Sequence, residues 1–223
     1  VWRVQRLVDG LDIPITFFAA ATALERNPEV AAWLKEAGHE PCSHGWRWEE
    51  VWTLSREEEK QHMLWAIESF KRTVGQRPQG WYCRYGPSVH TRELLVEEGG
   101  FVYDADAYND DLPYFQEVSG KRHLVVPYSF TYNDARFVLS QGYSSPSDFA
   151  DYLKRAFDTY WEEGAERPRM MSIGLHPRMI GQAARISALK EFIEYALDKG
   201  DVWFAKRLDI ATWWLEHHEE FGA

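Results

Sequence analysis

The chain has 223 residues, of which 45% are hydrophobic and 27% charged, as is typical of a folded globular protein. Its net charge of −10 argues against nucleic acid or an anionic membrane surface as partner, because both require clustered Lys and Arg. No apolar run reaches the roughly 18 residues of a membrane span, and no signal-type segment opens the chain. We therefore expect one cytoplasmic α/β domain over residues 1–223.

Strand and helix patterns alternate along the chain. In the first half we expect a helix over 1–10, a strand over 13–20, a helix over 27–38, a strand over 39–43, a helix over 55–74, a strand over 81–84, a helix over 87–99 and a strand over 101–106. In the second half we expect a strand over 124–128, a helix over 147–164, a strand over 170–176, a helix over 185–199, a strand over 202–206 and a helix over 208–219. The acidic stretch between the strands at 101–106 and 124–128 predicts a long loop or a hairpin.

Local signals set the helix ends and the start of the chain. Ser55 with Glu58 predicts a capping box, and Ser147 is the expected N-cap of the helix that ends at Gly164. No cap precedes Val1, so we expect that upstream sequence with at least one strand is absent. The two cysteines, at positions 42 and 83, are expected to be free thiols, because a chain of this size needs no disulfide.

Seven strands that alternate with helices imply parallel pairing through right-handed crossovers. An open doubly wound sheet and a closed barrel both fit this order. No glycine-rich phosphate turn follows the first strand, which removes the main sign of a dinucleotide-binding sheet. We therefore favour a barrel of about seven parallel strands.

Reactive residues follow many of these strands. In chain order they are His44, Arg84, Asp104 with Asp106, Tyr128, His176 with Arg178, and Arg207. In a parallel barrel all strand ends of one direction lie on one face, so we expect these residues around one pocket. Two histidines on one rim suit general acid–base chemistry or metal binding. The alternatives stay open: Arg84 could pair with a carboxylate, Asp104 or Asp106 could cap a turn, and Arg207 could anchor the last helix.

Aromatic residues are abundant, with 11 Trp, 11 Tyr and 12 Phe. Trp46 and Trp48 could line the pocket or pack beneath the loop after His44. Because aromatic residues are favoured at interfaces, we expect a homo-oligomer. An aromatic-lined pocket is the alternative explanation.

Four segments resemble a known family. They are Ser43-His44-Gly45-Trp46-Arg47-Trp48, Gly80-Trp81-Tyr82 with Thr91-Arg92, Tyr103-Asp104 with Asp110-Asp111-Leu112-Pro113-Tyr114, and Met171-Ser172-Ile173-Gly174-Leu175-His176. Together they resemble the polysaccharide deacetylase (NodB-homology) superfamily, and most closely its allantoinase and cyclic-imide hydrolase branch. The resemblance covers nearly all of the chain. It implies a distorted (β/α) barrel and the hydrolysis of amide-type C–N bonds, and together with the aromatic content it implies that the homo-oligomer is a tetramer.

The chain departs from that family at the metal site. Deacetylases of the superfamily bind a divalent metal such as zinc with a first-strand aspartate and a His-x-x-x-His pair, but Trp48 stands four residues after His44. The aspartate is not present in this chain either. His44 alone cannot supply the three protein ligands of a catalytic zinc site. The allantoinase branch shares this substitution and is similar in lacking a full metal triad, so the resemblance leaves open whether a metal or none is bound.

The resemblance also implies roles for individual residues. His176 matches the late histidine that acts as general acid or stabilises the oxyanion, and His44 would assist an upstream carboxylate in activating water. Arg84 and Arg178 suit carbonyl, ureido or carboxylate groups of a cyclic amide substrate, because guanidinium donors are planar and fixed. Asp104 is a further substrate-binding candidate. Trp46, Trp48 and Tyr108 would form the wall of a small, flat pocket.

Two other functions remain possible from the sequence. One is deacetylation of an N-acetylated sugar polymer, which needs an open groove. The acidic loop over 109–115 could close such a groove, which favours the small substrate. The other is a catalytically inactive binding protein, for which the missing metal ligand would be the reason.

Overall fold

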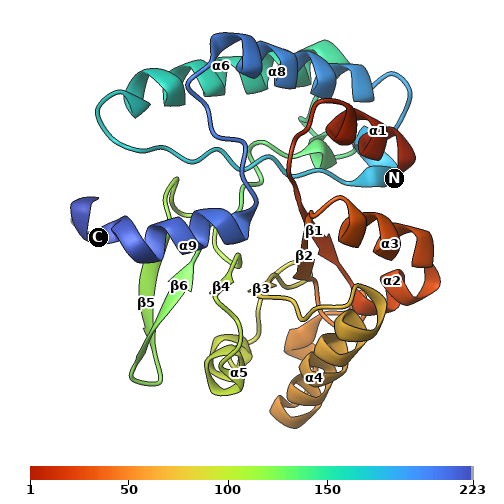
Figure 1. Ribbon diagram of the computed structural model, residues 1–223, viewed down its shortest axis with the longest axis vertical. Helices are drawn as coiled ribbons and strands as arrows, with labels where there is room; N and C mark the ends of the chain where they lie inside the picture. Colours follow the sequence, from red (N-terminus) through yellow and green to blue (C-terminus); the bar gives the residue numbers. More distant parts are fainter. Residues whose placement is uncertain (222–223) are drawn as a thin grey trace. The chain divides into compact units, whose positions relative to one another are not determined.

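A six-stranded sheet forms the centre of the fold in the computed structural model, which describes residues 1–221. The strands are β1 (Thr16–Ala19), β2 (Glu40–Ser43), β3 (Gly80–Trp81), β4 (Tyr103–Asp104), β5 (Tyr114–Val118) and β6 (Lys121–Val125). Their order in the sheet is β1-β2-β3-β4-β6-β5, and neighbouring strands are parallel except for the β5–β6 hairpin (Figure 1). The mostly parallel α/β sheet predicted from the sequence is thus confirmed, with the hairpin in the acidic stretch.

The helices follow the predicted order with small shifts at their ends. They are α1 (Trp2–Gly10), α2 (Ala21–Arg26), α3 (Pro28–Glu36), α4 (Arg56–Thr73), α5 (Thr91–Glu98), α6 (Pro146–Gly164), α7 (Pro177–Ile180), α8 (Ile186–Lys199) and α9 (Arg207–His217). Short 3-10 turns occupy Val51–Thr53, Asp134–Phe137 and His218–Phe221. None of the helices within residues 1–221 is long and apolar enough to cross a membrane.

Two predicted strands are wrong. In the segment 170–176 only Gly174 forms a bridge, to Asn133, and the segment 202–206 has no strand pairing. Both segments have apolar residues that suit a strand, but a strand also needs a partner with matching hydrogen bonds along its length. His176 therefore does not end a strand and instead precedes α7 as its N-cap residue.

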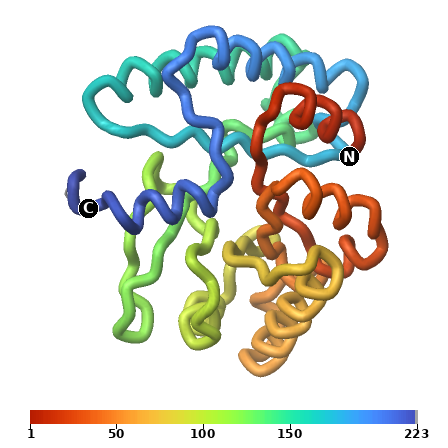
Figure 2. The backbone as a smooth tube through the Cα atoms, viewed as in Figure 1, coloured from red at the N-terminus to blue at the C-terminus, as the bar shows by residue number. Residues whose placement is uncertain are grey.

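The described chain divides into two compact units, each of which draws on several chain segments. One unit contains the sheet and comprises residues 14–107, 113–127 and the part from Ala205 onward. The other comprises residues 1–13, 108–112 and 128–204, and it includes α1, α6 and α8. Figure 2 lets the reader follow both sets of segments along the backbone. The expectation of a single catalytic domain over the whole chain stays a prediction.

In the unit with the sheet, a close aromatic contact fixes the spacing of β3 and β4. A Cβ atom at Gly80 would lie 2.3 Å from the ring of Tyr103, so only glycine fits beneath that ring. The adjacent Trp81 is 2% exposed and contacts Phe101 edge-on, with ring centroids 5.4 Å apart. Burial of a large apolar side chain of this kind contributes roughly 1.5–3 kcal/mol, so this contact is a main part of the core.

A buried carboxylate connects the sheet to the last helix. The side chain of Glu40 on β2 accepts hydrogen bonds from Thr16 Oγ1 at 2.6 Å, Tyr103 Oη at 2.8 Å and the Leu208 N–H at 2.9 Å. Leu208 lies in the first turn of α9, where backbone N–H groups lack helical partners and the helix dipole favours an anion. Arg207 donates from Nη2 to the carbonyls of Val126 and Pro127, and so anchors α9, one of the two roles that the sequence allowed.

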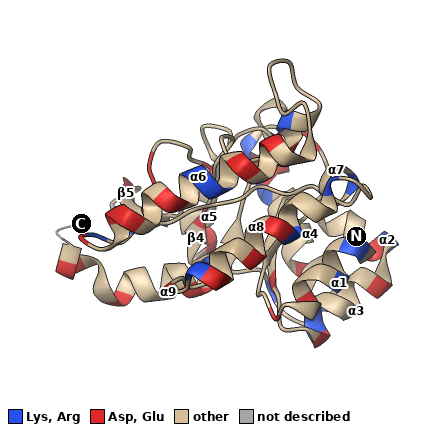
Figure 3. Ribbon diagram, turned by 90° about the horizontal axis from the view of Figure 1, so that it is seen from above, with Lys and Arg blue, Asp and Glu red and all other residues tan. Residues whose placement is uncertain are grey.

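In the other unit α6 and α8 lie side by side, and the rings of Phe157 and Phe192 meet edge-on between them at 6.0 Å. Acidic and basic positions are interspersed along both helices in Figure 3. Two ion pairs join the two helices, from Lys154 Nζ to Glu191 Oε1 at 2.5 Å and from Lys199 Nζ to Asp158 Oδ1 at 2.6 Å. Such exposed pairs contribute little, so the apolar contact holds these helices together.

The first turn of α6 corrects the predicted cap. Ser55 and Glu58 form the capping box predicted for α4, but α6 begins at Pro146 and its N-cap is Ser145. The Asp148 N–H donates to Ser145 Oγ at 3.2 Å, and the Asp148 carboxylate accepts from the Ser145 N–H at 2.9 Å. Pro146 explains the shift, because proline is favoured at the first helical position, where its missing N–H is not needed.

This correction predicts a difference between two serines. Ser145→Ala should lower the free energy of unfolding by about 1 kcal/mol, because it leaves an N–H at the start of α6 without its acceptor. Ser147→Ala changes an exposed serine inside the helix and should stay within about 0.5 kcal/mol of the parent. Urea denaturation of both variants measures the difference, and equal losses would contradict the assignment of Ser145 as the cap.

Candidate active site

The parallel register brings several strand ends to one edge of the sheet. Ser43 pairs with Trp81, and Trp81 pairs with Asp104. The residues after these strands therefore leave the sheet at the same edge, as the strand-end pattern predicts for His44, Arg84 and Asp106. Polar groups from separate parts of the sequence meet there within one compact unit.

His44 is held at this edge by its backbone and its ring. Its N–H donates to the Ala19 carbonyl at 2.8 Å, and Nδ1 lies 2.7 Å from the carbonyl oxygen of Tyr82. Because a carbonyl only accepts, Nδ1 carries the proton and Nε2 is the accepting nitrogen of the neutral ring. The imidazole stacks on the Tyr82 ring at 4.9 Å, and Trp48 contacts it edge-on at the same centroid distance. The ring is therefore fixed in both orientation and tautomer.

Arg84 joins His44 and Trp48 in one group, which we call the His44 cluster. Its guanidinium carbon lies 5.3 Å from the centre of the Trp48 ring and 4.2 Å from that of Tyr85. Nη1 also donates to the Glu50 carboxylate at 3.3 Å, so the pairing considered from the sequence is present. The side chain is still 20% exposed. Stacking on aromatic rings holds a guanidinium while part of its donor edge stays accessible to a ligand.

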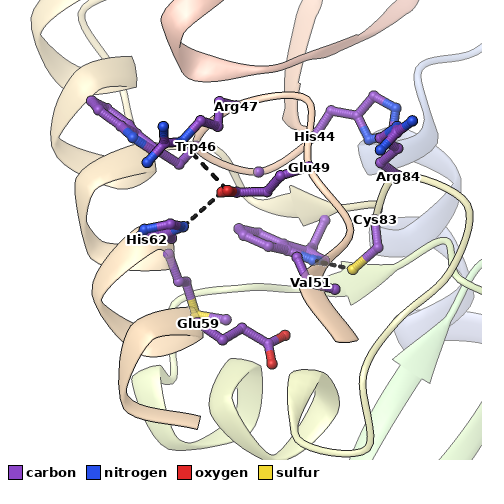
Figure 4. A pocket seen from close by; sticks show the side chains of 12 residues that line it. His44, Trp46, Arg47, Glu49, Val51, Glu59, His62, Cys83 and Arg84 are labelled. Carbon is purple, nitrogen blue, oxygen red and sulfur yellow. Dashed lines mark hydrogen bonds and ion pairs between the residues drawn. The ribbon is translucent and has the colours of Figure 1, made fainter. Parts of the chain in front are cut away.

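Trp46 lies away from the His44 cluster. Its ring contacts Trp65 of α4 at 5.6 Å, and Trp65 in turn stacks on His62. His62 is bonded to Glu49 at 2.6 Å. Trp46 thus packs against α4 and also lines the small hollow shown in Figure 4, while its predicted part in substrate binding stays a prediction.

A small hollow lies between the loop after β2 and α4 (Figure 4). Glu59 and His62 line it from α4, together with Cys83 and Arg84 from the loop after β3. Its volume of about 10 Å³ has room for about one water molecule. This hollow is too small for an organic substrate.

Both cysteines are buried free thiols, as predicted.

Asp104 lies in a buried polar network. Its carboxylate is fully buried and accepts from Arg92 Nε at 2.9 Å, His123 Nε2 at 2.8 Å and the Asp106 N–H at 2.8 Å. Burial alone would raise the pKa of Asp104, but the hydrogen bonds from His123 and Arg92 outweigh burial and lower the pKa. These contacts give Asp104 a structural role, and its predicted contact with substrate stays a prediction.

His176 forms a dyad with Asp134 in the other compact unit. Nδ1 of His176 lies 2.6 Å from Asp134 Oδ1, and the backbone N–H groups of His176 and Ile180 donate to Oδ2 at 2.8 and 3.0 Å. The carboxylate only accepts, so Nδ1 carries the proton and Nε2 is the reactive nitrogen. Asp134 is fully buried, whereas the His176 side chain is 29% exposed. An oriented, partly exposed imidazole of this kind is suited to general acid–base catalysis.

The sequence analysis did not identify Asp134. Its N–H donates to the Gly174 carbonyl at 3.0 Å, which places the 3-10 turn that carries Asp134 beside the segment that carries His176. The residues from 129 to 145 match neither a strand nor a helix pattern. The Asn133-Asp134 pair is the one available signal, because both residues favour caps and turns, and Asn133 does cap this turn through its side chain.

Two further candidates lie in the same unit as His176. Tyr108 is 39% exposed and stacks on Phe130 at 4.3 Å, with Tyr128 at 6.2 Å from both rings. Arg178 is exposed on α7. The predicted rim shared by His44 and His176 stays a prediction, because these two histidines belong to different compact units.

The described residues do not fit a catalytic metal site. Within residues 1–221, no group of three or more His, Cys, Asp and Glu side chains could hold a metal ion. Nδ1 of His44 is bonded to the Tyr82 carbonyl, and Trp48 is not a metal ligand. His44 as a zinc ligand stays a prediction.

Comparisons with known proteins agree on one family. The family model for polysaccharide deacetylase matches residues 1–103. A Schizosaccharomyces pombe protein provisionally named as a polysaccharide deacetylase is 33% identical, over 97% of this chain and 73% of its own length. A Helicobacter pylori peptidoglycan deacetylase is 25% identical, over 99% of this chain and 71% of its own length.

A solved structure gives the same answer for the fold. The crystal structure of Puue allantoinase has a TM-score of 0.93 and 49% identity, over 97% of this chain and 72% of that protein. The α/β fold with a distorted barrel expected from the resemblance is thus confirmed. The chain belongs to the polysaccharide deacetylase family and is a hydrolase of that family.

Proposed function

We propose that this hydrolase opens the ring of a small cyclic amide, such as allantoin, a hydantoin or a cyclic imide. The observation that carries the proposal is the position of Trp48. Its ring packs edge-on against His44 at the place where a second metal-binding histidine would stand. An aromatic wall suits a small, flat ring, whereas tryptophan cannot replace that histidine as a metal ligand.

The degree of similarity to solved structures does not choose between a cyclic amide and an N-acetylated sugar as substrate. The allantoinase structure is 49% identical to this chain, and a solved structure of a Pseudomonas aeruginosa protein described as a probable polysaccharide deacetylase is 48% identical. Because fold alone does not define a substrate, the proposal is argued from the side chains of the site.

Ring opening requires three events at the scissile amide. Water adds to the carbonyl carbon, the C–N bond breaks, and the departing nitrogen receives a proton. His176, held by Asp134, would supply that proton from Nε2 as an imidazolium, and it is restored through solvent by the proton that the attacking water loses. His44 has its accepting nitrogen fixed and would take up a water proton. Arg84 would bind a carbonyl oxygen of the substrate.

Deacetylation of an N-acetylated sugar is the second candidate. Trp48 is 47% exposed and Tyr85 is 62% exposed, and exposed aromatic rings of this kind could stack on a sugar. An inactive binding protein is the third candidate, and the lack of a fitting metal site among the described residues is the reason to keep it.

A substrate panel tests the proposal. The protein is incubated with allantoin, hydantoin, succinimide and a chitooligosaccharide, and ring opening and acetate release are measured separately. We expect turnover of at least one cyclic amide and no acetate. Acetate release alone would show the sugar deacetylase, and no turnover of any compound would favour the binding protein.

A further inference from the structure

Asp106 is a buried carboxylate that the proposed chemistry does not use. It follows β4, is 7% exposed, and accepts the same N–H, that of Cys83, at 2.9 Å on Oδ1 and 3.1 Å on Oδ2. Cys83 is 1% exposed and directly precedes Arg84. A carboxylate thus holds the start of the segment that carries the guanidinium of the His44 cluster.

The charge of Asp106 is not neutralised by a basic partner. Arg92 donates through Nε and Nη2 to the carboxylate of Asp104. Its bond to Asp106, from Nη2 at 2.9 Å, goes to the backbone carbonyl and not to the carboxylate. The titratable groups that face Asp106 are Cys42 from β2, Cys83 after β3, Arg92 from α5 and Asp104 from β4, with His123 of β6 bonded to Asp104. The neighbouring charged residue on β4 is Asp104, which carries the same negative charge as Asp106.

The segment that Asp106 holds has a constrained backbone. Tyr85 has a φ of +63°, in the left-handed region that residues with a side chain rarely adopt. Its ring and that of Trp48 stack on Arg84. The N–H of Cys83, one residue before Arg84, attaches this strained turn to the neighbouring strand end through Asp106.

We propose that Asp106 is a positioning residue, whose charged carboxylate fixes the turn 83–86 and thereby the substrate-binding position of Arg84, and which releases that turn when it is protonated. A charged acceptor forms a stronger hydrogen bond than a neutral one, so protonation weakens the bond from the Cys83 N–H. Only the kinetic part of this inference rests on the proposed ring hydrolysis.

The pH range and the sign follow from the surroundings. Burial, and after it the neighbouring Asp104 carboxylate, raise the pKa of Asp106 to about 7. The folded protein then binds one more proton than the unfolded chain between about pH 4 and pH 7, so stability falls as pH rises through that range. The charged form of Asp106 thus lowers the stability of the fold but orders the turn 83–86. Protonation raises the stability of the fold and releases the turn.

The experiment compares the parent with Asp106→Asn, and with Asp151→Asn as a control at an exposed aspartate of α6. Asp106→Asn should melt several degrees above the parent at pH 8 and at about the same temperature at pH 5. The fluorescence of Trp48 is isolated by subtracting the tryptophan emission of the Trp48→Phe variant from that of the parent. This difference should change near pH 7. That transition should be absent in the Asp106→Asn background and unchanged with Asp151→Asn.

Kinetics on the best cyclic amide form the third measurement. At pH 8, Asp106→Asn should raise KM about tenfold with a smaller effect on kcat, as expected for the loss of a substrate-binding position. A variant that melts below the parent at both pH values, or an emission transition that persists in Asp106→Asn, would overturn the inference. Melting and emission need no substrate, so they decide the inference even if the panel shows that no cyclic amide is hydrolysed.

Discussion

Replacement of His176 with alanine is expected to lower kcat on the best substrate by about 100-fold or more, the scale of a positioned acid–base group. The reason is the dyad with Asp134, which fixes the proton on Nδ1 and leaves Nε2 for proton transfer. The fold should survive, because the backbone N–H groups of His176 and Ile180 still bind Asp134. Steady-state kinetics measure the effect, and a thermal melt checks the fold.

Two further variants make this test specific. Asp134→Asn should also lower kcat strongly, because an amide that donates to Nδ1 favours the wrong tautomer. His217→Ala, at a half-buried histidine of α9 that pairs with Glu220 and stacks on Trp213, should leave kcat unchanged. If His176→Ala melts like the parent and keeps more than about a tenth of its kcat, His176 has only a packing role.

Asp104→Ala should destabilise the protein by about 3–5 kcal/mol, the cost of breaking a buried ion pair on one side. Arg92 and His123 would each lose their carboxylate, and His123 is 5% exposed, so water cannot replace the bond. Urea denaturation at pH 5.5 is the suitable measurement. Asp106 is largely protonated at that pH, so relief of the repulsion between the two aspartates does not offset the loss.

The pH dependence provides a second check on Asp104. Its pKa is lower in the folded protein than in the unfolded chain, so its contribution is present above about pH 4 and disappears as pH falls below that value. The difference in the free energy of unfolding between the parent and Asp104→Ala should therefore become smaller below about pH 4. Asp110→Ala, at an exposed loop residue, is the control. A loss below about 1 kcal/mol at pH 5.5 would show that the network is not a stabilising one.

Regular elements were predictable because their signals are local. The strand at 39–43 and the capping box of Ser55 depend on residues close in sequence, and both are present. The segment 170–176 has an equally good local pattern but forms only the bridge at Gly174. Whether such a segment becomes a strand depends on a partner from a distant part of the chain, and no local pattern contains that information.

The sequence predicted where several candidate site residues lie, but not which side chains they contact. Strand ends place His44 and Arg84 at one edge of the sheet, which follows from parallel pairing. Asp134 was missed because it lies in an irregular turn, and its role depends on contact with a residue 42 positions away. Asp104 has the same sequence context as a substrate-binding residue, but the half-buried Arg92 and the buried His123 bind it.

The contact between Gly80 and the Tyr103 ring makes the residues at positions 80, 103 and 40 depend on one another. Any residue larger than glycine at position 80 would displace that ring, whose hydroxyl donates to Glu40. Glu40 in turn accepts from the first turn of α9, so a change at position 80 would reach the C-terminal helix. Among relatives of this chain, positions 80, 103 and 40 should therefore vary together, and a relative with alanine at position 80 should carry a smaller residue than tyrosine at position 103.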